Sequence, residues 1–349
     1  MLIPSDELES FLRRCRDEPI GPYRKIHVPI KPGDGGASFS SLAPLRGDLR
    51  LALDGYRSVD PPKLLAYRVR EGVAPFAGSS SPALLAGVKA CDVKGFEVLD
   101  RALINGDFTD PAYASWRERT TILSFDCTDV GPTCHCTLTG GKPFAETGFD
   151  ANAARFGQDY YLSAATEKGR ALLELIGRHA RVDAACTQMP PAAETRRAEM
   201  TARVQAQNEA FQRPKDYGRL RSSPPQAWQE EARECVGCGA CTHICPTCYC
   251  LILNEEGRGG AFLKVRSYDS CQLHGYARVA AGVSPRPRVD DRFRHRYLCK
   301  LVIMKGEFGA LGCTGCGRCT EACPGGIEFR SVVRRLMEMP SGERSAEAG

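Results

Sequence analysis

Two short stretches near the C-terminal end repeat one spacing of cysteines. Residues 235–246 read CVGCGACTHICP and residues 313–324 read CTGCGRCTEACP, so both follow the pattern C-x2-C-x2-C-x3-C-P. Gaps of two residues let one loop present three thiolates to three irons of a four-iron cube, and the intervening glycines permit the backbone angles this requires. In two-cluster ferredoxins the fourth thiolate comes from the other run. The spacing therefore predicts two [4Fe-4S] clusters.

This exchange of the fourth ligand assigns eight cysteines to the two clusters. The predicted ligands are Cys235, Cys238, Cys241 and Cys323 for the first cluster, and Cys313, Cys316, Cys319 and Cys245 for the second. The competing interpretation is a structural zinc site, because paired C-x2-C motifs also form zinc ribbons. Zinc needs only four ligands, and two identical four-member runs closed by proline exceed that requirement.

The other cysteines and the N-terminus indicate where such a chain resides. The N-terminal sequence MLIPSDELESFLRRCRDE carries acids and arginines where a signal peptide needs an apolar run. Nor does any stretch approach about 18 consecutive apolar residues. We therefore expect a cytoplasmic protein with no membrane span, in which 18 cysteines cannot be a disulfide framework. The 47 basic and 42 acidic residues are too balanced to indicate a nucleic-acid partner.

The first half of the chain has the pattern of an α/β domain. A length of 349 residues favours two domains. Residues 83–90 (ALLAGVKA) and 120–127 (TTILSFDC) read as strands separated by a helix, which indicates parallel βαβ units. The stretch 160–163 followed by TEKGRALLELIG repeats this alternation. We therefore predict an α/β domain over residues 1–190.

Two helices of this domain can be described in more detail from the sequence. Leu8, Phe11, Leu12 and Cys15 share one face of a helix that Ser5 would cap, which makes Cys15 a core thiol. Asp92 would cap the helix that follows the first strand.

The remainder of the chain divides into a linker, a second domain and a tail. Residues 191–224 contain a polar, helix-favouring stretch and are predicted to form a helical linker. Residues 225–340 are expected to be a mostly helical, two-cluster ferredoxin-like domain, in which YDSCQLHGYARVAAG forms a helix. Residues 341–349 lack apolar side chains and are expected to be disordered.

A third metal site is predicted in the first domain. Cys91 and Cys127 each follow the carboxyl end of a proposed parallel strand, so their loops open onto one edge of the sheet, where open α/β sheets bind ligands. Cys134 and Cys136 are close enough in sequence to complete a set of four thiolates. We expect a third [4Fe-4S] cluster here. The alternatives are a zinc site with His135 as a ligand, and reduced thiols lining a pocket.

The sequence assigns no ligand role to the other thiols. Cys248, Cys250 and Cys271 could ligate another centre, but three cysteines without a clear fourth more often belong to the core or shield a cluster. Cys186 and Cys299 are expected to be buried. No motif for a nucleotide, flavin or hydrolase site is present, so no flavin or nucleotide is expected in this chain.

Taken together, these motifs resemble one family over most of the chain. They are ACD at 90–92, VLDR at 98–101, the segment 127–136, CVGCGACTHICPTCYC at 235–250, YDSCQ at 268–272, RFRHRYLCK at 292–300 and CTGCGRCTEACP at 313–324. The chain resembles the iron-sulfur β subunit of cytoplasmic sulfhydrogenases, which are [NiFe] hydrogenases using NADP, and the related iron-sulfur subunit of anaerobic sulfite reductase. It departs from their pattern at Tyr268, where tryptophan is expected, and at His135, where an aromatic residue is common.

This resemblance implies a role in electron transfer and two kinds of partner. It implies an iron-sulfur relay between a flavin subunit that handles NAD(P)H and a catalytic subunit that carries nickel-iron or siroheme. Catalysis would then occur in the partner, and this chain would contain no catalytic residue. Two alternatives belong to other classes: a reductase whose substrate reacts at an open cluster in the first domain, and a zinc-stabilised scaffold.

Overall fold

The computed structural model describes residues 1–339 except 19, 32–39, 48, 77, 79–80, 212–213 and 215. The expected disordered tail, residues 341–349, lies outside the described residues. In the described part of the chain, no helix combines the length and the apolar composition needed to cross a lipid bilayer.

A seven-stranded mixed sheet forms the centre of the N-terminal half, with strand order β1-β8-β7-β6-β5-β2-β3. The four central strands β7, β6, β5 and β2 are parallel, and the strands added at either side are antiparallel. The strands are β1 (Leu2–Pro4), β2 (Lys25–Ile30), β3 (Ser41–Pro44), β5 (Ala83–Val88), β6 (Thr120–Phe125), β7 (Ala151–Phe156) and β8 (Asp159–Ala164).

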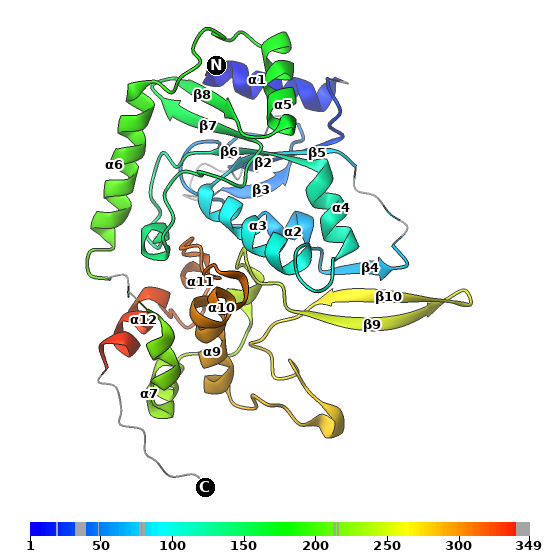
Figure 1. Ribbon diagram of the computed structural model, residues 1–349, viewed down its shortest axis with the longest axis vertical. Coiled ribbons are helices and arrows are strands. Elements are labelled where there is room, and N and C mark those ends of the chain that lie inside the picture. Colours follow the sequence, from blue (N-terminus) through cyan, green and yellow to red (C-terminus); the bar gives the residue numbers. More distant parts are fainter. Residues whose placement is uncertain are drawn as a thin grey trace.

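Helices cover both faces of this sheet (Figure 1). They are α1 (Ser5–Asp17), α2 (Lys63–Ala66), α3 (Ala90–Leu103), α4 (Pro111–Arg119) and α5 (Glu167–His179). Side chains alternate along a strand, so Leu84 and Ala86 of β5 join the core under α1 and α5, whereas Leu85 joins the core under α3 and α4. The pairing of β5 with β6 shifts between Ala86 and Val88, and this irregularity places Val88 on the same face as Leu85. The expected α/β architecture with parallel strands is thus present.

The parallel β5–α3–β6 unit was expected, but the strand at 160–163 takes a different place. This strand, β8, runs antiparallel to β7, a strand that the sequence pattern did not reveal. Phe156 pairs with Asp159, so the two strands are joined by Gly157 and Gln158 alone. Gly157 has φ +54°, and such a two-residue turn produces a hairpin instead of a crossover.

The helix starts also differ from expectation. The predicted apolar face of α1 is buried, and Cys15 is a core thiol. Ser5, however, is the first helical residue and Pro4 occupies the capping position. Likewise Lys89 precedes α3, and Asp92 lies inside its first turn. Its carboxylate binds an arginine from the other half of the chain instead of capping the helix.

The C-terminal half begins with the long helix α6 (Pro191–Gln207), and short helices follow around a separate core. The short helices are α7 (Pro225–Glu231), α8 (Ala240–His243), α9 (Val289–Leu298), α10 (Met304–Phe308), α11 (Arg318–Glu321) and α12 (Phe329–Glu338). The short turns are η1 (Cys136–Thr139) in the N-terminal half, and η2 (Gly218–Ser222), η3 (Ala280–Gly282) and the π-helical η4 (Cys299–Ile303) in the C-terminal half. Trp228, Phe293, Tyr297 and Phe329 pack together in this core. The helix predicted in the linker is present as α6.

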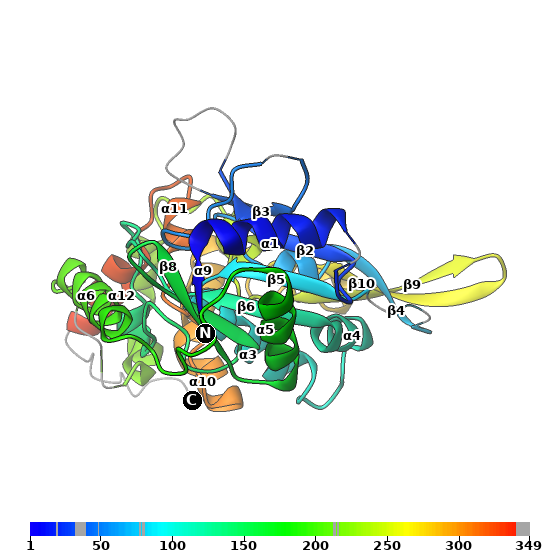
Figure 2. The same ribbon diagram turned by 90° about the horizontal axis from the view of Figure 1, so that it is seen from above.

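A three-stranded sheet departs from the expected, mostly helical second half. It consists of β4 (Arg70–Ala74), β10 (Ala261–Tyr268) and β9 (Leu251–Arg258), in that order. The hairpin β9–β10 projects from the body (Figures 1 and 2) and turns at Gly259 and Gly260, whose φ angles of +58° and +80° suit a tight two-residue turn. The stretch YDSCQLHGYARVAAG, predicted as a helix, forms turns and η3 instead. Strand β4 comes from within residues 1–190, so this sheet joins the two predicted domains.

A buried ion pair also joins the two halves. The Arg318 guanidinium donates to both carboxylate oxygens of Asp92, at 2.6 and 3.0 Å, and both side chains are at most 1% exposed. The Arg318 Nε group donates to the backbone carbonyls of Ser58 and Val59, each at 2.9 Å. A bidentate pair with these additional hydrogen bonds fixes α11 against the start of α3.

Breaking this pair should destabilise the protein. In Asp92→Asn the buried guanidinium of Arg318 loses its counter-charge, and one-sided removal of a buried pair costs about 3–5 kcal/mol. We expect guanidinium denaturation of the anaerobically purified protein to show a loss of stability of that order. Glu167→Gln, which breaks an exposed ion pair with Arg170, is the matched control and should leave the denaturation midpoint unchanged. Equal midpoints for the two variants would contradict the assigned role of Asp92.

Candidate metal centres

The two cysteine runs adopt the same local conformation. In the first run Gly237 and Gly239 have φ +67° and +79°, and in the second run Gly315 and Gly317 have φ +68° and +73°. Residues with a side chain rarely adopt this left-handed region, which explains the glycines at matching positions. Each run contains a one-turn helix, α8 or α11. The repeated spacing thus produces a repeated loop.

The first thiol set lies around one cavity. Its four members are Cys235, Cys238, Cys241 and Cys323, and they line this cavity together with Phe293, Arg296 and Phe329. Cys323 belongs to the second run, so the structure brings the fourth thiol to the first run in the way expected of a two-cluster ferredoxin.

The second thiol set comprises Cys313, Cys316, Cys319 and Cys245. Burial, together with the charges of the neighbouring Cys319, Cys316 and Cys245 thiols, raises the pKa of Cys313. Burial also raises the pKa of Cys319 to about 11, with smaller contributions from Cys316 and Cys245. Cys245, from the first run, therefore lies beside the thiols of the second run. The two sets exchange one member each.

Arg296 supplies positive charge between these two sets. It is only 7% exposed, and its guanidinium lies over the rings of Tyr297 and Phe329, 5.2 and 5.3 Å from their centroids. Burial alone would lower the pKa of Arg296, but the neighbouring Cys241 and Cys319 thiolates hold it well above its usual value. A cation in this position offsets the charge of thiolates from both runs.

The third thiol set is also brought together. Its members are Cys91 in the first turn of α3, Cys127 just after β6, and Cys134 and Cys136 in the following loop. Burial raises the pKa of Cys127, and the nearby Cys134 and Cys136 thiols raise it further. Burial also raises the pKa of Cys91, and the Cys127 thiol adds to this increase. The thiols thus neighbour one another after the carboxyl ends of β5 and β6, and a metal site shared by them stays a prediction.

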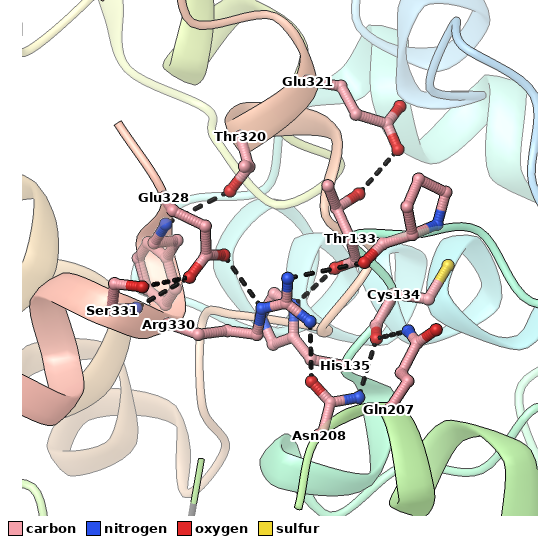
Figure 3. Close-up of polar contacts among 12 residues, drawn as sticks. Thr133, Cys134, His135, Gln207, Asn208, Thr320, Glu321, Glu328, Arg330 and Ser331 are labelled. Atoms are coloured by element: carbon pink, nitrogen blue, oxygen red, sulfur yellow. Dashed lines mark hydrogen bonds and ion pairs between the residues drawn. The ribbon is translucent and has the colours of Figure 1, made fainter. Parts of the chain in front are cut away.

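The loop that carries Cys134 is held on both sides (Figure 3). The side-chain amides of Gln207 and Asn208, at the end of α6, donate to the Cys134 carbonyl. On the other side, the Thr133 hydroxyl donates to Glu321 of α11 at 2.6 Å. Arg330 of α12 donates to Asn208 at 2.8 Å, so the end of α6 is itself bound to the second domain. The cysteine loop is thereby fixed to both the connecting helix and the second domain.

His135 faces the second thiol set, a role that the sequence did not indicate. Its backbone N–H donates to the Gly315 carbonyl at 2.7 Å, and its Nε2 atom lies 3.7 Å from the Cys313 sulfur. The ring stacks on Phe329 with centroids 5.9 Å apart. Burial lowers the pKa of His135 to about 4, so the imidazole is neutral at pH 7. Its place between Cys134 and Cys136 gave no hint of this contact, because Cys313 is distant in sequence.

The second and third sets are themselves neighbours, which the sequence also did not show. The Cys316 thiol contributes to the raised pKa values of Cys91, Cys134 and Cys136. Arg57, which is 3% exposed, donates to the Cys316 carbonyl at 2.8 Å and pairs with Glu321. Buried cations therefore lie beside this junction too.

The remaining thiols differ in their surroundings. Cys186 is half-buried, contrary to expectation, and its Sγ atom lies 3.2 Å from the Gln188 carbonyl oxygen, outside all three sets. Cys299 was also expected to be buried and is half-buried. Among the residues the structure describes, no three Cys, His, Asp or Glu side chains converge closely enough to coordinate a single metal ion. The sets are therefore defined by which thiols neighbour one another.

Comparisons with known proteins agree with this arrangement. Residues 234–327 match the model of a 4Fe-4S dicluster domain. The chain is 30% identical over 296 residues to sulfhydrogenase 2 subunit beta of Pyrococcus furiosus, which corresponds to 82% of this chain and 86% of that protein. No solved structure matches the chain. With a relative this similar over most of both lengths, the chain belongs to the family of iron-sulfur β subunits of sulfhydrogenases.

Proposed function

We propose that this chain relays electrons through three [4Fe-4S] clusters. The observation that carries the proposal is the closeness of the thiol sets. The second run packs at Gly315 on the backbone of Cys136, and the His135 N–H donates to the Gly315 carbonyl at 2.7 Å. The Cys245 thiol contributes to the raised pKa of Cys241 in the first set and of Cys313 in the second. Electron tunnelling falls steeply with distance, so adjacent clusters would exchange electrons readily. The second cluster would occupy the middle of this path.

The three thiol sets supply the proposed ligands. The first cluster would be held by Cys235, Cys238, Cys241 and Cys323; the second by Cys313, Cys316, Cys319 and Cys245; and the third by Cys91, Cys127, Cys134 and Cys136. Each set has four thiols, the usual ligand number for a [4Fe-4S] cluster. Thiolates are soft ligands that suit iron-sulfur clusters as well as zinc, so metal analysis is part of the test.

The surroundings of the sets suit a role in electron transfer. A cluster bound by thiolates carries negative charge, and adding an electron to it is easier near buried cations and hydrogen-bond donors. Arg296 lies beside the first two sets, and Lys89 lies beside the third, where its Nζ group donates to the carbonyls of Leu53 and Asp126. We infer that these side chains adjust the reduction potentials.

The proposed relay connects two other subunits. By similarity to the sulfhydrogenase family, we propose a flavin subunit that handles NAD(P)H at one end and a catalytic subunit with nickel-iron or siroheme at the other. The residues of this chain would then bind and shield clusters, and the chemical reaction would occur in the partner. A cytoplasmic location accords with this proposal.

Replacing Cys316 should interrupt the relay at its middle. In Cys316→Ser we expect about four fewer irons per chain than in the wild type, and loss of one cluster signal from the EPR spectrum of the dithionite-reduced protein. Neighbouring reduced clusters broaden one another's EPR signals, so the remaining signals should narrow. NAD(P)H-driven electron flow in the complex that co-purifies with the tagged chain should fall at least tenfold.

The matched control is Cys186→Ser, which changes a half-buried thiol outside the three sets and should leave iron content and electron flow unaltered. Unaltered electron flow in Cys316→Ser would refute the relay. Zinc without iron would favour the scaffold, and a substrate-induced spectral change in the isolated chain would favour reduction at an open cluster.

Gly315 should be essential for the contact between the second and third sets. A Cβ atom there would lie 2.4 Å from the Cys136 Cα atom and 2.5 Å from its nitrogen, and φ is +68°. We expect Gly315→Ala to lower both the iron content and the denaturation midpoint of the anaerobic protein, because backbone atoms must move apart.

Gly326→Ala separates this steric effect from backbone strain. Gly326 has nearly the same φ, +64°, but a Cβ atom there would meet nothing within 4 Å. The Gly326→Ala variant should therefore retain its full iron content, and only the positive φ should destabilise it, by a modest amount. If the two variants behave alike, close packing at Gly315 does not hold the sets together.

A further inference from the structure

Four cysteines outside the three sets line a single cavity of about 300 Å³. Cys248 and Cys250 come from the loop after the first run, Cys271 follows β10, and Cys299 begins the π-helical turn η4. The sequence pattern offered only three of these thiols as a group. The fold supplies the fourth, Cys299, because α9 ends beside the same loop.

The thiols around this cavity are close to one another. Cys250 and Cys271 shift each other's pKa, downward for Cys250 and upward for Cys271, and the Cys299 thiol also raises the pKa of Cys271. Burial raises the pKa of Cys299, and the Cys250 and Cys245 thiols raise it further. Cys248 and Cys245 of the second set also shift each other's pKa, upward for Cys248 and downward for Cys245. The four thiols thus converge from three segments on one side of the dicluster domain.

The backbone around Cys299 and Cys248 is arranged in unusual ways. Cys299 begins a five-residue π-helical turn directly after α9, and such turns are rare in proteins and frequent at functional sites. At Cys248, the backbone carbonyl accepts a hydrogen bond from the Lys63 Nζ group at 3.0 Å, although Lys63 is 1% exposed. Burying a charged lysine costs free energy unless the lysine is well paired. The hydrogen bond from Lys63 therefore indicates that the loop is held in a defined position at Cys248.

Positive charge faces the same cavity. Lys300 is 4% exposed, and its Nζ group donates to the Thr247 hydroxyl at 2.7 Å. Arg296 lines this cavity as well as the cavity of the first set, and its Nε group has no hydrogen-bond partner among the described residues. Buried positive charge beside a group of thiols is also present at the other sets.

Polar donors also point at the sulfur atoms. The Gln272 side-chain nitrogen lies 3.5 Å from the Cys271 sulfur, and the same amide donates to the Arg292 carbonyl at 2.8 Å. Together with Cys271, the Tyr276 hydroxyl lowers the pKa of the Cys250 thiol. Hydrogen bonds to sulfur are a principal means by which proteins tune iron-sulfur clusters.

We propose that Cys248, Cys250, Cys271 and Cys299 hold a fourth [4Fe-4S] cluster. This proposal extends the relay function and rests on the iron-sulfur role proposed above. Cys248 places the new site beside the second set through its contact with Cys245, and Arg296 borders both this site and the first set. The fourth cluster would then open a second route out of the dicluster domain.

The number of clusters in the wild-type chain tests this directly. We expect about sixteen irons per chain after anaerobic purification, and a mass under non-denaturing conditions that corresponds to four clusters. About twelve irons, with a mass that corresponds to three clusters, would overturn the fourth site and leave the three-cluster relay intact. A chain without iron would overturn both proposals.

Two variants locate the additional cluster. Cys271→Ala and Cys299→Ala should each lose about four irons and retain about twelve, which also shows that the rest of the protein folds. Cys186→Ala is the matched control and should retain all of them. Unchanged iron content in both variants, or one equivalent of zinc that disappears in them, would overturn the assignment.

Discussion

Negative charge from closely spaced thiolates is the constraint to which much of this structure responds. A buried anion is costly unless positive charge or hydrogen bonds compensate it. In this chain a buried cation accompanies each group of cysteines: Arg296 lies between the first two sets, Arg57 and Lys89 lie beside the third, and Lys300 lies beside Cys248 and Cys299. Burial alone would lower the pKa of Lys300, but the Cys245, Cys248 and Cys299 thiolates hold it well above its usual value. Arg296, Arg57, Lys89 and Lys300 are thus explained by the thiols around them.

The contacts between the two halves of the chain meet a second constraint: they hold separate thiol sets close together. Gly315 allows the second run to pack directly on the backbone at Cys136, and the His135 N–H donates to the Gly315 carbonyl. The Asp92–Arg318 pair fixes the second run to the start of α3 as well. Asp92 directly follows Cys91, and Arg318 lies between Cys316 and Cys319. One buried ion pair therefore positions ligands of two different sets.

Local patterns in the sequence were sufficient for the parts of the fold that depend on neighbouring residues. The repeated cysteine runs, the β5–α3–β6 unit and the buried face of α1 all follow from spacing within short segments. Contacts between distant segments were not accessible in this way. The hairpin β9–β10 was missed although Gly259 and Gly260 are a turn signal, and its pairing with β4 joins residues far apart in the chain. The same limit hid the approach of Cys316 to Cys91, and of Cys299 to Cys250.

The position of the second set determines the path that electrons would follow in the proposed relay. Cys245 and Cys316 place this set in contact with the first and third sets, and Cys248 adjoins Cys245 on another side. A cluster in the middle of such an arrangement would exchange electrons with each neighbour, so the path would branch there instead of following one line. The third set lies at the sheet edge of the α/β half, whereas Cys238 of the first set is exposed at the surface. These two sets therefore lie in different halves of the chain, which suits a protein whose electron donor and acceptor are separate proteins.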